Sequence, residues 1–160
     1  MMFKHKLNRA FLMLIMLISI GATSASAQQN PIKWRCLARM TSATEGVVTV
    51  RALIAEGWHL YGLVMPDGGP KATVISLDSS KDVKFTSDLV PNHAPLVKRD
   101  AIFDMDVNFW EQKVEFSCKF KVTGPNPKIA GSVTYMGCND ETCSPPATVS
   151  ITAPVTPIKK

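Results

Sequence analysis

The fold is decided by one strictly alternating stretch, Val114-Glu115-Phe116-Ser117-Cys118-Lys119-Phe120-Lys121-Val122. Successive side chains of a β-strand point to opposite faces, so this pattern predicts a strand with one buried apolar face and one solvated polar face. Residues 48–54 repeat the pattern, with valine, alanine and isoleucine at every second position. These long half-buried strands indicate a fold built on β-sheets.

Turn signals separate further short apolar stretches on both sides of these strands. Examples are Pro66-Asp67-Gly68-Gly69-Pro70 and Gly124-Pro125-Asn126-Pro127, whose residues favour chain reversal. The additional expected strands are residues 32–40, 59–64, 72–77, 83–89, 129–136 and 147–151. No long helical period interrupts them, and strands at this spacing are typical of a sandwich. We therefore expect an all-β, antiparallel immunoglobulin-like β-sandwich that forms a single domain over residues 28–160.

Residues 1–27 have the features of a signal peptide rather than of folded structure. Three basic residues precede an apolar run over residues 10–20, and Ala25-Ser26-Ala27 supplies the small residues that a signal peptidase inspects. We expect cleavage before Gln28. The alternative is an uncleaved anchor, but the run is shorter than the ~20 residues that a membrane-spanning helix needs. No membrane span is therefore expected in the mature chain.

Composition excludes a disordered chain, because 46% of the 160 residues are hydrophobic and only 19% are charged. The 18 basic and 13 acidic residues give a formal net charge of +5, and loss of the three basic residues in the leader gives 18 − 3 − 13 = +2. The remaining basic residues are scattered among acidic ones and form no stripe with aromatic residues, so we expect no nucleic acid partner. The remaining 160 − 27 = 133 residues can bury a core without crosslinks, so the cysteines need another explanation.

The four cysteines all lie in the part of the chain that we expect to be exported: Cys36, Cys118, Cys138 and Cys143. Thiols outside the cytoplasm tend to be oxidised, and four cysteines allow three sets of pairings. Only four polar residues separate Cys138 from Cys143, so a disulfide between them would close a very short loop. Such a bond removes little conformational entropy from the unfolded chain and is a poor structural crosslink.

A short disulfide is better explained as a redox group. A thiolate attacks a disulfide through a mixed-disulfide intermediate, which a second nearby thiol resolves. Cys138 follows a strand and should be partly covered, whereas Cys143 closes a polar loop before Ser144 and two prolines and should lie nearer to solvent. The alternatives are a plain hairpin crosslink and a metal site that adds Asp140, Glu141 or a histidine to the thiols. Because the spacing matches no zinc pattern, we expect no metal and no cofactor.

Cys36 and Cys118 lie on the apolar faces of their predicted strands and should point inward. They form either a structural disulfide between distant strands or two buried free thiols that act as small hydrophobic side chains. The distance between the two positions separates these alternatives, and the sequence does not give it.

Two segments carry a resemblance to a known family. They are Gly131-Ser132-Val133-Thr134-Tyr135-Met136-Gly137-Cys138, continuing to Cys143-Ser144-Pro145-Pro146, and the upstream Gly57-Trp58-His59-Leu60-Tyr61. Over essentially the whole mature chain, the sequence resembles the N-terminal periplasmic domain of DsbD-type thiol:disulfide interchange proteins. The resemblance implies an immunoglobulin-like sandwich that exchanges electrons with thioredoxin-like proteins. It also implies that Cys143 forms mixed disulfides with partners and that Cys138 is its internal partner.

The same resemblance implies a cap loop whose aromatic side chain shields the disulfide. The matching stretch is residues 100–104, with Phe103 as the expected cap and Ile102 as the second choice. The alternative is that Phe103 is an ordinary apolar residue of an edge strand. Asp100 could tune the charge near the cysteines, although a lone surface aspartate usually has no such role.

His59 and Tyr61 match positions that line the active cysteines in the family. They alternate with Trp58 and Leu60, so we expect His59 and Tyr61 on one face of a sheet and the other two in the core. A histidine near a thiol could favour the thiolate. The alternative is a solvated His59 without a catalytic part.

These features predict a periplasmic thiol:disulfide exchange module, a protein-disulfide reductase or electron-transfer domain that acts through Cys138 and Cys143. The expected partners are thioredoxin-like periplasmic proteins of the disulfide isomerase or cytochrome c maturation type. Family members continue into a membrane-embedded electron carrier and this sequence ends at Lys160, so a membrane electron donor is expected to act in trans. The alternative function is that of a non-catalytic exported β-sandwich that binds or assembles and has structural disulfides.

Overall fold

The computed structural model describes residues 30–78 and 80–156, so the expected signal peptide over residues 1–27 lies outside the described residues. The strands are β1 (Ile32–Met40), β2 (Glu45–Ile54), β3 (His59–Tyr61), β4 (Val74–Leu77), β5 (Val83–Phe85), β6 (Val90–Pro91), β7 (Leu96–Asp100), β8 (Met105–Glu111), β9 (Lys113–Val122), β10 (Lys128–Tyr135), β11 (Gly137–Cys138) and β12 (Ala147–Pro154). Within the described residues, nothing forms a helix long and apolar enough to cross a membrane.

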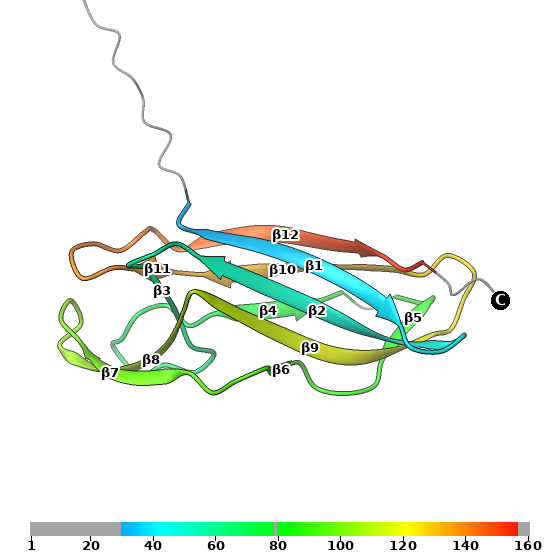
Figure 1. Ribbon diagram of the computed structural model, residues 1–160, viewed down its shortest axis with the longest axis horizontal. Coiled ribbons are helices and arrows are strands. Elements are labelled where there is room, and N and C mark those ends of the chain that lie inside the picture. The colour runs from blue at the N-terminus through cyan, green and yellow to red at the C-terminus, as the bar shows by residue number, and fades with distance from the viewer. Residues whose placement is uncertain (1–29, 79, 157–160) are drawn as a thin grey trace, which may run out of the picture.

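The strands form three antiparallel sheets (Figure 1). The largest sheet has the order β1-β2-β9-β5, with β6 also paired to β9, and it shares a core with the sheet β12-β10-β4. The small sheet β11-β3-β8-β7 lies at one end of the long axis, at the left of the figure. The chain is therefore an all-β, antiparallel immunoglobulin-like sandwich, as the sequence predicts.

Strand β9 lies inside the largest sheet, where it pairs with β2 on one edge and with β5 and β6 on the other, and its apolar face is buried from Val114 to Phe120. Val114, Phe116 and Phe120 are at most 1% exposed, which confirms the alternation predicted for this stretch. Phe116 pairs in register with Val50 of β2 and lies in one cluster with Val133 of the facing sheet. The core between the two sheets thus follows directly from the alternating pattern.

Strands β7 and β8 form a hairpin that the sequence pattern does not predict. The side chains of β7 are exposed except for that of Asp100, so β7 lacks alternation. In β8, the neighbours Phe109 and Trp110 are both buried, because adjacent strand residues point to opposite faces and both faces are covered here. Trp110 contacts Phe116 of the main core at 5.2 Å between ring centroids, whereas Phe109 faces a separate cluster.

We expect Phe116→Ala to lower the free energy of unfolding by about 3–5 kcal/mol, because it leaves a cavity at a fully buried position. Denaturant unfolding measures this difference. The matched control Lys119→Ala, on the exposed face of the same strand, should change stability by less than about 0.5 kcal/mol. An equal loss in the two variants would contradict the central place of β9.

Candidate redox site

Cys138 and Cys143 form a disulfide across two antiparallel neighbouring segments. The backbone N–H of Asn139 donates to the carbonyl of Thr142 at 2.9 Å, and the N–H of Ser144 donates to the carbonyl of Gly137 at 2.8 Å. These bonds flank the cysteines, which are therefore a non-hydrogen-bonded pair, the arrangement in which opposite residues approach most closely. The two Cα atoms are 4.0 Å apart.

The loop between the cysteines is closed by its own polar groups. The side-chain oxygen of Asn139 accepts hydrogen bonds from the N–H groups of Glu141 at 3.0 Å and Thr142 at 2.7 Å, which is an Asx-type turn. The Ser144 hydroxyl donates to the carbonyl of Gly137 at 3.0 Å. The turn thus has hydrogen bonds that do not require the disulfide.

The two sulfur-bearing residues differ in exposure, as the sequence predicts. Cys138 is 0% exposed. It pairs with His59 of β3, and its side chain lies in a buried apolar cluster. Cys143 is half-buried and follows the exposed loop tip. A reagent approaching from solvent therefore meets Cys143 first.

A small apolar cluster lies beneath the disulfide. Its buried members are Tyr61, Val107, Phe109, Met136 and Cys138, with Met65, Phe103, Met105 and Cys143 partly buried around them. The Tyr61 hydroxyl is 4.0 Å from the sulfur of Cys143. Leu60, which precedes Tyr61, belongs to the main core, and Trp58 packs against the same core. The expected division between the two faces of this segment is confirmed.

Asp100 anchors the hairpin turn that lies over this cluster. The Tyr61 hydroxyl donates to its Oδ2 at 2.7 Å, and the N–H groups of Ile102 and Phe103 donate to its Oδ1 at 2.8 and 3.1 Å. The Nε2 atom of His59 lies 3.6 Å from Oδ2. The buried Asp100 side chain therefore joins β3 to the turn through its hydrogen bonds. The sequence, which shows only a lone aspartate, does not predict this structural role.

Charge in this cluster is set by burial and by Asp100. Burial alone would raise the pKa of Asp100, but the hydrogen bonds from Tyr61, Phe103 and Ile102, together with His59, outweigh it and hold the pKa below its ordinary value. Burial, the hydrogen bond to Asp100 and its negative charge raise the pKa of Tyr61. The carboxylate and the neutral phenol are thus both favoured at neutral pH.

His59 does not carry the positive charge that would favour a thiolate. Burial lowers the pKa of His59, and the opposing effects of Asp100, Glu111 and Asp140 do not restore it. The side chain is only 12% exposed, so the alternative of a solvated histidine is also wrong. Its ring packs 5.0 Å from that of Tyr61 and 4.8 Å from that of Phe109. At pH 7, His59 is therefore a neutral packing residue.

Phe103 lies in the turn between β7 and β8 and not in an edge strand. Its ring meets that of Tyr61 edge-on, with centroids 6.0 Å apart, and it packs on the same cluster as Cys143. Ile102, the second choice for the cap, is 45% exposed and points more to solvent. The next residue, Asp104, has a positive φ of 52°, which an aspartate in a tight turn tolerates.

Cys36 and Cys118 are free cysteines, so the alternative of a structural disulfide between them is wrong. Strands β1 and β9 both pair with β2, which lies between them. Two strand spacings are about 9.5 Å, whereas bridged cysteines need Cα atoms within about 7 Å. Burial raises the pKa of Cys36 to about 11 and also raises that of Cys118. Both thiols act as core side chains.

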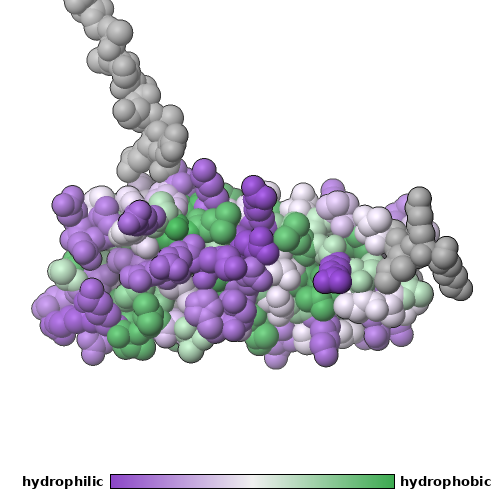
Figure 2. Space-filling view, in the orientation of Figure 1, coloured by the Kyte–Doolittle hydropathy of each residue, from purple (hydrophilic) through white to green (hydrophobic). Residues whose placement is uncertain are grey.

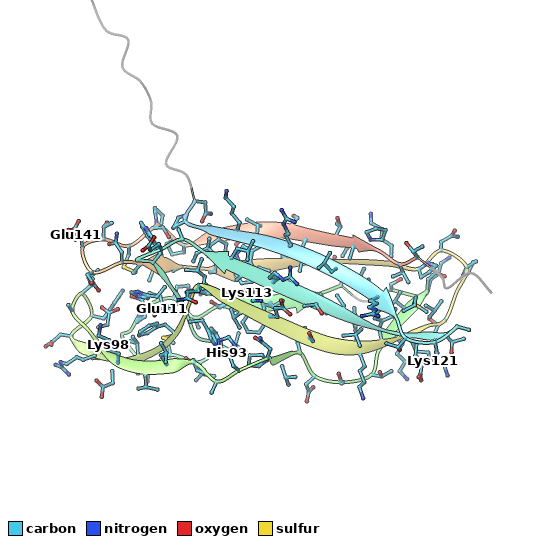
Figure 3. All side chains as sticks on the ribbon, viewed as in Figure 1. His93, Lys98, Glu111, Lys113, Lys121 and Glu141 are labelled. Atoms are coloured by element: carbon cyan, nitrogen blue, oxygen red, sulfur yellow. A yellow bond between two sulfur atoms is a disulfide. The ribbon has the colours of Figure 1, made fainter. Side chains whose placement is uncertain are left out.

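A cleft of about 810 Å³ lies beside the disulfide loop. Its walls include His59, Asp100, Ile102, Asn139 and Asp140. Figure 3 shows Glu111 and Lys98, which also line it, at the same end of the molecule as Glu141 of the loop tip. No sequence signal predicts this cleft, since its walls come from segments far apart in the chain. In residues 30–78 and 80–156, no group of three or more His, Cys, Asp or Glu side chains is placed to hold a metal ion.

Residues 32–154 match the family model described as the N-terminal domain of the thiol:disulfide interchange protein DsbD. The chain belongs to this family. The DsbD N-terminal family is one of thiol:disulfide exchange domains, and the cysteine pair of this member is formed as a disulfide. No curated protein matches the chain significantly.

Solved structures with a similar fold include the N-terminal periplasmic domain of ScsB from Proteus mirabilis, with a TM-score of 0.52 and 18% identity over 76% of this chain and 44% of that chain. The reduced DsbD N-terminal domain of Neisseria meningitidis has a TM-score of 0.44 and 17% identity over 70% and 85% of the two chains. The complex between the DsbD and PilB N-terminal domains of Neisseria meningitidis has a TM-score of 0.46 and 16% identity over 74% and 80%. The chain thus spans less than half of the ScsB chain that it matches.

We expect Asp100→Asn to lower the free energy of unfolding at pH 7 by about 1–3 kcal/mol, because it removes the charged acceptor of three hydrogen bonds, one of them buried and two partly buried. The pKa of Asp100 is lower in the fold than in the unfolded chain, so ionised Asp100 stabilises the fold above pH ~4. This contribution is lost as the pH falls through the folded-state pKa. Denaturant unfolding at neutral and acidic pH should therefore show the difference from wild type shrinking in acid.

The matched control is Asp106→Asn, because Asp106 is an exposed carboxylate on the neighbouring strand. It should change stability by less than about 0.5 kcal/mol at either pH. A loss in Asp100→Asn that stays constant in acid would show that the carboxylate charge is not what stabilises the turn.

Proposed function

We propose that this domain is a periplasmic thiol:disulfide exchange module that passes two electrons through Cys138 and Cys143, to or from thioredoxin-like partners. The observation that carries the proposal is the asymmetry of the disulfide: Cys138 is fully buried and Cys143 is only partly buried, in a polar loop beside a cleft. A purely structural disulfide does not require one cysteine to be more exposed than the other. An exchange reaction needs this asymmetry, because the exposed sulfur is attacked and the buried one resolves.

Exchange proceeds through a mixed disulfide between the partner and Cys143. A partner thiolate attacks the sulfur of Cys143, the Cys138–Cys143 bond breaks, and Cys138 leaves as a thiolate that takes up a proton. The second thiol of the partner, as thiolate, then attacks the partner sulfur of the mixed disulfide and releases Cys143. The partner leaves with a new disulfide, and the domain keeps two electrons and two protons as a dithiol. Delivery to an acceptor is the reverse sequence, in which Cys143 attacks and Cys138 resolves.

Phe103 is the residue that we assign as the cap, with Ile102 as the second choice. Phe103 packs edge-on against Tyr61, whose hydroxyl lies 4.0 Å from the sulfur of Cys143. Attack on a disulfide needs open space in line with the sulfur that is attacked, so the turn at residues 101–104 has to move before a partner reacts. A resting cap limits adventitious exchange with small thiols and leaves the site open to partners that displace it.

The proposed partners are thioredoxin-like periplasmic proteins of the disulfide isomerase or cytochrome c maturation type, together with a membrane electron donor. Family membership supports this class of partner. The domain would reach the periplasm by the signal peptide expected over residues 1–27. Chemically, any such partner must present a reactive cysteine on a surface able to enter beside the exposed loop.

We expect Cys138→Ala to trap a stable mixed disulfide with a thioredoxin that retains only its exposed active-site cysteine, activated as the thionitrobenzoate adduct. The Cys143 thiolate attacks, thionitrobenzoate leaves, and no internal thiol resolves the product. Release of the coloured thionitrobenzoate and peptide mapping measure the reaction. The Cys143→Ala variant should form almost no mixed disulfide with this thioredoxin.

The matched control is Cys138→Ala combined with Cys36→Ala, which should trap as well as the single variant because Cys36 has a pKa raised to about 11. Cross-linking through Cys138 in the Cys143→Ala variant would contradict the assigned roles. If none of the variants reacts, the domain is a non-catalytic binding module.

We expect Phe103→Ala to speed reduction of the wild-type cysteine pair by a small thiol about 2- to 10-fold, since it removes an aromatic contact worth about 0.5–1.5 kcal/mol from the closed cap. Stopped-flow kinetics with dithiothreitol gives the rate, and Cys143 should remain the sulfur attacked. Ile102→Ala is the matched control at the adjacent, more exposed position. A larger acceleration from Ile102→Ala would reassign the cap to Ile102.

A further inference from the structure

The solvated face of the sheet β1-β2-β9-β5 gathers most of the positive charge of the domain. The basic residues whose strand positions place them on this face are Lys33, Arg35, Arg39, Arg51, Lys84, Lys113, Lys119 and Lys121. The acidic residues on it are Glu45 and Glu115. The formal net charge of this face is therefore 8 − 2 = +6.

The rest of the described chain carries the opposite charge. Of the 18 basic residues, five lie outside residues 30–78 and 80–156, which leaves 13 against all 13 acidic residues and a described net charge of zero. Removing the face leaves 13 − 8 = 5 basic and 13 − 2 = 11 acidic residues, a charge of −6. The expectation that the basic residues are scattered among acidic ones holds along the sequence but is wrong in space.

Few of these positive charges are neutralised locally. Arg51 Nε lies 2.8 Å from Glu115 Oε1, and Lys113 Nζ lies 3.7 Å from the same oxygen. The other six basic side chains of the face form no ion pair with a described residue. Figure 3 places Lys113 and Lys121 near opposite ends of β9, so the positive charge extends along the strand. A field of one sign over such a length attracts an extended anionic partner.

The shape of the face distinguishes between kinds of anionic partner. Strands about 4.8 Å apart, with alternate residues about 6.8 Å apart, spread these groups over a plane instead of converging them on one anion. Figure 2 shows hydrophilic side chains across this face, with isolated apolar patches between them. Leu37 and Leu53, 48% and 37% exposed, are among the apolar side chains on it. No aromatic residue lies on this face in the described strands, whereas single-stranded nucleic acid binders stack bases on aromatic rings.

We propose that this face binds the surface of a lipid bilayer that contains anionic headgroups. Lysine and arginine side chains attract anionic headgroups, and the exposed leucines enter the boundary between headgroups and acyl chains. The inference is independent of the exchange chemistry. Because the disulfide lies at the end of the long axis and not on this face, a domain bound in this way keeps its redox site accessible (Figure 1).

The test compares two triple variants of residues 28–160, the chain expected after cleavage of the signal peptide. Lys33→Gln, Lys119→Gln and Lys121→Gln remove charge from the face, and Lys71→Gln, Lys81→Gln and Lys128→Gln remove the same charge from exposed positions elsewhere. Binding is measured by co-sedimentation with phosphatidylcholine vesicles, with and without phosphatidylglycerol, over a salt series.

We expect wild type to bind only the vesicles that contain phosphatidylglycerol, and more weakly as salt rises. The face variant should bind at least about tenfold more weakly, whereas the control variant should stay close to wild type. Changing the same three face lysines to arginine should keep the binding, which shows that charge and not folding is responsible. Joint replacement of Cys138 and Cys143 by alanine should leave it unchanged, so this test does not depend on the exchange function.

Three results would overturn the proposal. They are equal binding to neutral and anionic vesicles, equal losses in the face and control variants, and binding of polyglutamate through the face without binding of anionic vesicles. The last result would assign the face to an acidic protein partner.

Discussion

In β8, one aromatic side chain packs into the main core and its neighbour packs under the disulfide. Trp110 contacts Phe116 and donates a hydrogen bond from Nε1 to the carbonyl of His93 at 3.2 Å, which fixes β8 to the sandwich. Phe109 then lies on the opposite face, against His59 and beside Tyr61 in the register of β3 and β8. The small sheet that contains Cys138 is therefore positioned by the main core.

The buried carboxylate of Asp100 extends this support from the sheet to the turn at residues 101–104. It accepts one hydrogen bond from across the sheet, from Tyr61, and two from within its own turn, from Ile102 and Phe103. Hydrogen bonds to a charged group are among the stronger ones in proteins, and a buried carboxylate is stable only when its donors are present. The position of Phe103 beside the disulfide thus depends on the ionisation of Asp100.

The features of this protein that depend on local sequence patterns can be predicted from the sequence. The alternation in β9, the sandwich class and the exposure difference between Cys138 and Cys143 all follow from strand period and turn chemistry. The β7–β8 hairpin does not follow, because the side chains of β7 are exposed except for that of Asp100, and because β8 buries the adjacent residues Phe109 and Trp110 on opposite faces. Three features depend on strand order, which the sequence pattern does not specify. They are the free state of Cys36 and Cys118, the cleft and the basic face.

The turn at residues 101–104, which we propose as the cap, has internal bonds and separate contacts to β3. It is held internally by the two backbone N–H groups on Asp100 and by the ion pair of Arg99 with Asp104 at 2.6 Å. Its contacts to β3 are the hydrogen bond from the Tyr61 hydroxyl to Asp100, the approach of His59 Nε2 to Asp100 Oδ2 at 3.6 Å and the edge-on packing of Phe103 against Tyr61. Breaking these contacts to His59 and Tyr61 would leave the internal bonds of the turn in place. The proposed opening of the cap therefore requires the loss of its contacts to β3 and leaves the hairpin turn itself intact.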